Sequence, residues 1–464
     1  MNRNSLWSLR LGFSNQQAAS IEKMGISKFL EASFKTDFDN SLPDFLKDSP
    51  KTLPEFRAQR QKNGALDREK KQEFQKQEAL ISLDMKSWWI DKMRTENYPL
   101  REKMTLLLHN HFVSTYQKVK VNYWIFEHNQ LLRKYAFGNF KDLTKAIVKS
   151  NAMIRYLDNV DNRKGKINEN LSRELLELFT LGIGNYTEDD IKNGAKALAG
   201  LSFGDNGGIY RDRIADDSEI VYLGKKGHFK ADDIVDIIFK QKNSPYLFTR
   251  KILQWFIYDN PSPELVTYYG DYFKKQNFEI QPLLEKIFSE EFEKNTAGSK
   301  IKNPLEYSLQ VLSELQINPK TNKPIVAFLK SQGMDLFNQP NVKGWEGGKS
   351  WLTSQIYLQR NNLADLYCSG RENLNQKAAT MMMEETNNRP NLRKTAVKLH
   401  WNIGTNKQII GELSERLLFQ VDSETQKDFE NILKYDFDAH AQNANQVVLR
   451  LFNAMVKEPE FQLI

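Results

Sequence analysis

The sequence contains a single cysteine, Cys368, among its 464 residues. One thiol cannot form an intramolecular disulfide, and it cannot supply the cysteine clusters of zinc or iron–sulfur sites. Long apolar runs are also missing: no stretch approaches the roughly 18 residues that a membrane-spanning helix needs. The sequence therefore predicts no transmembrane segment. Histidine is scarce too, with six residues in the whole chain, two of which stand at 109 and 111.

An export signal is not evident at the start of the chain. Arg10 interrupts the apolar patch that begins at Leu6, so the uninterrupted core of a secretory signal is absent. We expect a cytoplasmic protein if the chain is complete, and a periplasmic or envelope protein if a signal has been removed. The sequence leaves both alternatives open.

Clustered charge is missing as well. Lys and Arg number 66 against 59 Asp and Glu, a net charge of +7. The densest basic stretch, residues 51–80, holds eight Lys or Arg and five acidic residues. Mixed signs at helical spacing are typical of a solvated helix face, whereas nucleic-acid binders show a concentrated basic patch. We therefore expect no nucleic-acid partner.

Helical periodicity is the dominant pattern in the chain, and it predicts an all-α, multi-helix globular protein. The first amphipathic helix is expected at 16–34. Residues 200–230 are rich in Gly and Asp with short Ile, Val and Tyr fragments, which indicates a small irregular or β-hairpin insertion. The predicted organisation is a single unit, 1–464. It is divided into an N-terminal helix and connection (1–65), a helical core (66–200), the insertion (201–230) and a C-terminal helical part (231–464).

The first candidate for chemistry is His109-Asn110-His111, near the end of a helix that should begin at Pro99. Helical spacing places His111 on one stripe with Leu107 and Met104, whereas His109 faces the other side. Both imidazoles can therefore bind one metal only if the helix ends or distorts here. The alternative is a pair of buried, hydrogen-bonded histidines.

The second candidate is the segment Asn168–Glu177, Asn-Glu-Asn-Leu-Ser-Arg-Glu-Leu-Leu-Glu. Glu169, Arg173 and Glu177 recur at a spacing of four, which braces a helix. Glu174 lies at the edge of the apolar face, so its carboxylate should be partly buried and needs a partner. A histidine, an arginine or a metal ion would serve. The alternative is a salt-bridged surface helix.

A third segment, Gly344–Ser350, superficially suggests a phosphate-binding P-loop. That motif requires four residues between its first glycine and Gly-Lys-Ser, and Lys343 stands at the position where this first glycine should be. No apolar strand precedes the segment. We interpret it as a tight structural loop that packs Trp345 and Trp351.

Together these segments resemble the bacterial domain-of-unknown-function 1800 family over nearly the whole chain. The matching segments are Arg10–Phe13, Pro99–Phe112, Leu131–Phe140, Tyr156–Asn159, Asn168–Gly182, Phe337–Trp351 and Pro459–Gln462. The resemblance implies no settled activity. It groups the polar motif residues in one region: His109, His111, Asn168, Glu169, Asn170, Arg173, Glu174 and Glu177. It also implies export and a sulfatase-like partner protein, although this chain departs from the family in lacking a clear signal.

Our leading hypothesis is a metal-assisted hydrolytic or oxidative site between the His109/His111 helix and the Glu169–Glu177 helix. His109, His111 and Glu174 would be the ligands of a divalent metal such as Zn, Mn or Fe. Glu174, Arg173 and Glu177 would be the catalytic residues, with a glutamate as general base and Arg173 binding an anionic group.

The alternative hypothesis is a non-catalytic envelope scaffold or partner-binding protein. In that case the same motif residues would form a buried polar network that fixes helix packing. Whether the chain is an enzyme is left open by the sequence.

Overall fold

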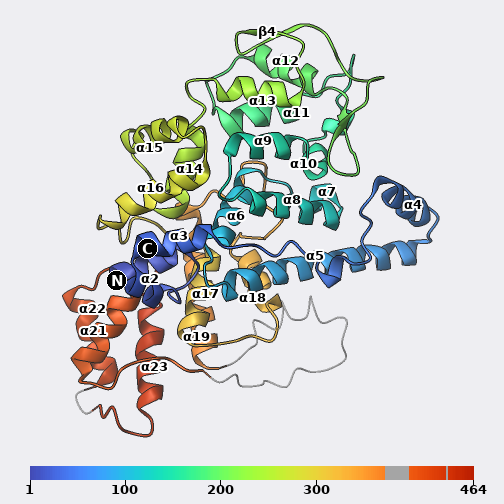
Figure 1. Cartoon of the computed structure of the whole chain (residues 1–464). Coiled ribbons are helices and arrows are strands. Elements are labelled where there is room, and N and C mark those ends of the chain that lie inside the picture. The colour runs from blue at the N-terminus through green and yellow to red at the C-terminus, as the bar shows by residue number, and fades with distance from the viewer. Residues whose placement is uncertain (371–396, 435–436) are drawn as a thin grey trace.

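The fold is described from a computed structural model that covers residues 1–370, 397–434 and 437–464. Helices form nearly all of its regular structure, and the strands of these ranges make only two small antiparallel sheets (Figure 1). The prediction of an all-α protein with a small β insertion is therefore confirmed. No helix in the described ranges is both long enough and apolar enough to cross a membrane.

The N-terminal segment holds three short helices and a long arm. The predicted helix at 16–34 is in fact two helices, because Gly25 adopts a φ of 78° and breaks it. A further helix precedes them, with the Asn2 side chain accepting a hydrogen bond from Ser5 N. The elements are α1 (Arg3–Leu11), α2 (Ala18–Met24), α3 (Ile26–Phe34), η1 (Asp44–Leu46), α4 (Leu53–Gly64) and α5 (Arg68–Thr95).

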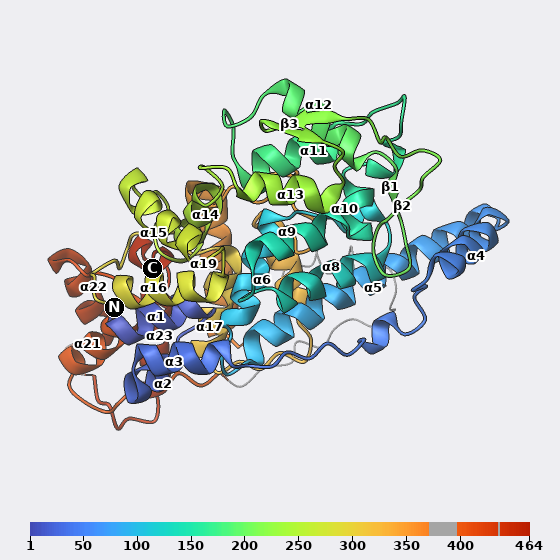
Figure 2. The ribbon, with the colours of Figure 1, turned by 45° about the horizontal axis from the view of Figure 1, so that its top comes forward.

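Helix α5 changes character along its length. Its buried residues begin at Ser82, and its first half is largely exposed. The apolar weight of Trp89, Ile90 and Met93 holds the second half in the core. The first half projects from the body as an arm that carries α4 at its far end (Figure 2).

The centre of the molecule is built around α6 (Leu100–His111), in which ten of twelve residues are buried. Helices α3, α5 and α8 pack against it. The other elements of this part are α7 (Tyr116–Val119), α8 (Asn122–Lys134), α9 (Phe140–Val148), α10 (Asn151–Tyr156), η2 (Asn159–Asp161), α11 (Asn170–Glu174), η3 (Leu175–Thr180) and α12 (Glu188–Leu198).

The insertion after residue 200 contains two hairpins. Strand β1 (Leu201–Ser202) pairs with β2 (Ile209–Tyr210), and β3 (Ile220–Tyr222) pairs with β4 (Lys225–Gly227). Leu223 and Gly224 both have positive φ, as a two-residue hairpin turn of the favoured hand requires. Leu223 N donates to Asp190 Oδ1 at 2.7 Å, which ties this turn to α12.

The C-terminal part closes the molecule so that both termini lie near each other (Figures 1 and 2). Ile301 pairs with Leu463 through an isolated bridge, which brings the end of the chain beside residues 300–302. The elements are α13 (Ala231–Phe239), α14 (Tyr246–Phe256), α15 (Pro263–Lys275), α16 (Ile280–Phe292), α17 (Pro304–Glu314), α18 (Lys323–Ser331), η4 (Gly348–Trp351), α19 (Ser354–Cys368), α21 (Asn406–Leu417), α22 (Ser423–Leu433), α23 (Ala444–Met455) and η5 (Pro459–Gln462).

Candidate functional site

The two motif segments singled out in the sequence are in direct contact. The His111 ring, at the last residue of α6, donates from Nε2 to the carbonyl oxygen of Phe179 at 3.0 Å. Phe179 lies in η3, a short π-helix that continues α11. The helix predicted at Glu169–Glu177 thus changes its hydrogen-bond pattern from α to π part-way along, a feature that often marks functional sites.

The surroundings of His111 are aromatic. Four phenylalanine rings lie with their centroids 4.4 to 6.0 Å from the imidazole: Phe112, Phe140, Phe179 and Phe248. Because a carbonyl oxygen can only accept, the proton must sit on Nε2, and Nδ1 is a buried lone pair without a partner in the described part of the chain. Burial, reinforced by the positive charge of Lys251, holds the pKa of His111 well below its ordinary value.

His109 faces a different set of neighbours. Its ring lies between those of Trp89, Phe337 and His128, and its Nε2 donates to the carbonyl oxygen of Ser114 at 3.2 Å. His128 donates in the same way to the Phe112 carbonyl at 2.8 Å. Burial lowers the pKa of His109 to about 3 and that of His128 to about 4, so both imidazoles are neutral at physiological pH.

Within residues 1–370, 397–434 and 437–464, no group of three or more His, Cys, Asp or Glu side chains is placed to hold a metal ion. The set of His109, His111 and Glu174 is therefore not assembled into such a group. The physical reason is the helical geometry of α6, which turns the two imidazoles into separate aromatic clusters.

The remaining predicted residues lie along α11 and η3. Arg173 donates to Glu169 and, with both terminal nitrogens, to Glu188 at 2.9 and 3.0 Å, so its guanidinium is engaged. Glu177 accepts a hydrogen bond from the Tyr186 hydroxyl at 3.0 Å. Glu174 is half-buried, and burial together with the negative charge of Glu177 raises its pKa, while the positive charges of Arg173 and Lys343 act against this shift.

A pocket of about 650 Å³ opens beside His111. Its wall combines the end of α6, the helix α14, residues 300–301, the loop 343–351 and Leu463. We name it the lysine pocket after the four lysines that line it: Lys251, Lys300, Lys343 and Lys349. Asp259 and Glu346 are its acidic residues, which leaves a formal charge of 4 − 2 = +2.

Asn110, the central residue of the His-Asn-His motif, fixes one wall of this pocket. Its Oδ1 accepts from Trp345 N at 2.6 Å and its Nδ2 donates to the Trp345 carbonyl at 3.3 Å. A side chain at Gly344 would overlap with Asn110, and Gly344 has a φ of 85°. Only glycine therefore allows the loop to approach α6 so closely. Trp345 and Trp351 are both buried, in agreement with a tight structural loop.

Lys251 is the most unusual group in the pocket. Its Nζ donates to the carbonyl oxygen of Leu178, one of the last carbonyls of η3, at 3.2 Å. This oxygen and that of Phe179 have no following helical turn to bond, so Lys251 and His111 satisfy them. Burial lowers the pKa of Lys251 to about 8. A minor fraction of this amine is therefore neutral near pH 7, which suits proton transfer.

Comparison with known proteins gives one match. The model of the family described as "Protein of unknown function (DUF1800)" matches residues 5–463, essentially the whole chain. The chain belongs to the DUF1800 family. No curated protein and no solved structure matches it.

The lysine pocket includes residues from two of the segments by which the DUF1800 resemblance is recognised. His111 and Asn110 come from Pro99–Phe112, and Lys343 to Trp351 come from Phe337–Trp351. Sequence reasoning missed Lys251 and Lys300, because neither lies in these segments and a lone lysine on a helix is normally solvated. The one available signal was the position of Lys251 in α14, where apolar Leu247 and Trp255 flank it at a spacing of four.

Proposed function

We propose that this DUF1800 protein is an enzyme that binds a small anionic substrate in the lysine pocket. The observation that carries the proposal is the placement of four lysines around one cavity of about 650 Å³, a size suited to small molecules. Because the four lysines outnumber the two acidic residues of the wall, the pocket has a net positive charge, which favours the binding of carboxylates, phosphates or sulfates.

The exposed and the buried lysines of the pocket would have different roles. Lys343 and Lys349 are exposed and would attract and hold the anion at the rim, whereas Lys300 is buried beside Glu306, with Nζ 3.8 Å from its Oε2. Lys251 would transfer a proton, since its pKa of about 8 lies close to physiological pH.

The residues predicted from the sequence receive narrower roles. Glu174 does not line the lysine pocket, but it remains a candidate general base, because burial and Glu177 raise its pKa and its carboxylate interacts electrostatically with Lys343, which does line the pocket. Arg173 and Glu177 would only position Glu174. Their own polar groups are already engaged, because Arg173 donates to Glu188 and Glu177 accepts from Tyr186. A metal ligated by both His109 and His111 is not part of this proposal.

A structural role for the histidines is the second candidate. Its supporting observation is that His109 and His111 are fully buried and that each donates to a backbone carbonyl. Such burial favours a structural role for these two histidines, as part of the buried polar network of the scaffold hypothesis. A structural role of the histidines is compatible with ligand binding in the pocket next to them.

Calorimetry with two simple anions tests the proposed function. We expect inorganic pyrophosphate or citrate to bind the wild-type protein at low ionic strength, where surface electrostatics are least screened. The Lys343→Gln/Lys349→Gln variant should bind at least about tenfold more weakly, because charge-assisted hydrogen bonds are lost. The matched control is Lys407→Gln/Lys427→Gln, which removes two exposed lysines elsewhere. Absence of binding at millimolar anion, or an equal loss in the control, would refute the proposal.

A further inference from the structure

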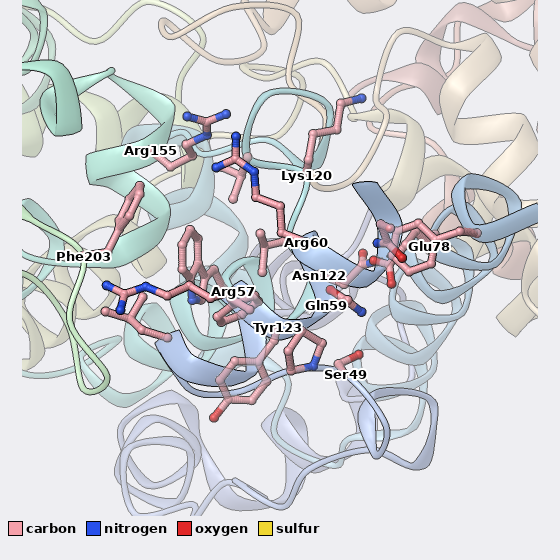
Figure 3. Close-up of a pocket in the computed structure, with 18 of the residues that line it drawn as sticks. Ser49, Arg57, Gln59, Arg60, Glu78, Lys120, Asn122, Tyr123, Arg155 and Phe203 are labelled. Atoms are coloured by element: carbon pink, nitrogen blue, oxygen red, sulfur yellow. Dashed lines mark hydrogen bonds between the residues drawn. The ribbon is translucent and has the colours of Figure 1, made fainter. Parts of the chain in front are cut away.

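A second cavity, of about 590 Å³, lies between α4, the start of α8 and Phe203 (Figure 3). It shares no lining residue with the lysine pocket. Five cationic residues from four parts of the chain line it: Arg57, Arg60, Lys120, Arg155 and Arg211. We call it the arginine pocket. Glu78 is its one acidic lining residue, so the formal charge is 5 − 1 = +4.

No acidic side chain in the part of the chain that the structure describes is paired with the four arginines. Across the described ranges, none of their guanidinium groups makes an ion pair or a side-chain hydrogen bond, in contrast to Arg133, which is paired with Glu102. Figure 3 shows the charged ends of Arg60 and Arg155 turned to the same side of the pocket. All four arginines are exposed to solvent, which screens the repulsion between them, and a bound anion would offset the repulsion that remains.

Glu78 does not neutralise the arginines. Its Oε2 accepts a hydrogen bond from Asn122 Nδ2 at 2.9 Å, and the same amide nitrogen also donates to the Glu78 backbone carbonyl. In Figure 3, Glu78 stands on the opposite side of the pocket from Arg57 and Arg155. The cationic side of the cavity is therefore free to receive an acidic group.

The remaining wall is aromatic. The ring of Trp124 lies 4.8 Å from that of Phe56 and 4.8 Å from that of Phe203, measured between centroids. Phe56 and Phe203 are only partly buried, and both line the cavity. Faces of such rings stack on planar ligands, and arginine side chains stack on them as well.

We propose that the arginine pocket binds a nucleoside phosphate, with the phosphate held by Arg57, Arg60 and Arg155 and the base stacked against Phe203. Arginine suits phosphate because its planar fork donates two parallel hydrogen bonds. A cavity of about 590 Å³ is in the range of small-molecule sites, which favours a single nucleotide over a strand. Two of these arginines come from residues 51–80, the segment expected to be only a solvated face. The proposal is independent of the function proposed for the lysine pocket.

The test is calorimetry of the full chain with AMP, GMP, CMP and UMP, each titrated separately. We expect at least one to bind at least about tenfold more tightly than adenosine, which lacks the phosphate, and than ribose 5-phosphate, which lacks the base. Arg57→Gln/Arg60→Gln should weaken that binding at least about tenfold, and Phe203→Leu about fivefold or more. Lys62→Gln, on the same helix but outside the pocket, should leave it unchanged.

Three outcomes would overturn the proposal. The first is no binding of any of the four nucleotides at millimolar concentration. The second is binding that Arg57→Gln/Arg60→Gln leaves unchanged while circular dichroism shows the variant folded. The third is binding of a ten-residue oligothymidylate more than about a hundredfold tighter than UMP, which would identify a single strand as the ligand instead.

Discussion

Lowering the pH from 7 to 5 is expected to remove about 4 kcal/mol of stability through two buried imidazoles, His109 and His128, and the buried His111 adds to this loss in the same direction. Their pKa values in the folded protein lie below the ordinary value of 6.5, with His109 at about 3 and His128 at about 4. Below pH 6.5 the unfolded chain therefore binds protons that the folded chain does not. This contribution to stability is fully present above pH 6.5 and is lost as the pH falls, by about 2 kcal/mol each for His109 and His128 at pH 5.

Urea unfolding at pH 7 and pH 5, compared between wild type and single variants, measures this effect. Glu127 works in the opposite direction, because burial raises its pKa to about 7, and comparing variants cancels its contribution. Replacing His109 or His128 with Gln should make the pH dependence shallower by about 2 kcal/mol. The control, His228→Gln, removes an exposed histidine and should not change it. Equal pH dependence in all of these proteins would contradict the assignment of neutral buried imidazoles.

Arg133→Met is expected to destabilise the protein by about 3–5 kcal/mol, since it leaves a buried carboxylate without its partner. Arg133 Nε and Nη2 donate to the two oxygens of Glu102 at 2.7 and 2.8 Å, and Trp89 Nε1 donates to the same carboxylate at 2.8 Å. Burial alone would raise the pKa of Glu102, but the Arg133 guanidinium and the Trp89 hydrogen bond outweigh it, and the pKa is lowered.

The double variant Glu102→Gln/Arg133→Met separates charge from packing. Replacing the carboxylate with an amide removes the unpaired charge, so the double variant should regain a substantial part of the lost free energy. The free energies come from urea unfolding followed by tryptophan fluorescence at pH 7. If the double variant is as unstable as the sum of both single variants, the two residues do not act as a pair.

The fold class could be predicted because local signals agree with the final structure. Helical periodicity covers most of the chain, and the Gly- and Asp-rich stretch after residue 200 does contain hairpins. The ends of individual helices were harder to predict than the fold class. Gly25 splits the predicted helix at 16–34, because a glycine inside a helical pattern can either continue the helix or take a positive φ.

The candidate site was only partly accessible from the sequence. The motif residues His111 and Phe179 do meet, but the partners of the polar groups are set by tertiary packing. His111 donates to a backbone carbonyl, which leaves no side-chain pattern to detect. Lys251 reaches the pocket from a helix about 140 residues away in the chain, and Asn110 acts through its contact with Trp345. The assignment of catalytic and metal roles to individual motif residues stays a prediction.

The most direct test of the lysine pocket is the titration of Lys251 itself. Competitive amine labelling across pH, read out by mass spectrometry, reports the pKa and the reactivity of each lysine. We predict that Lys251 titrates near pH 8, and that pyrophosphate raises its pKa and slows its labelling, because a bound anion stabilises the ammonium form. A Lys251 that titrates near the ordinary value of 10.5, with labelling unchanged by pyrophosphate, would contradict the account.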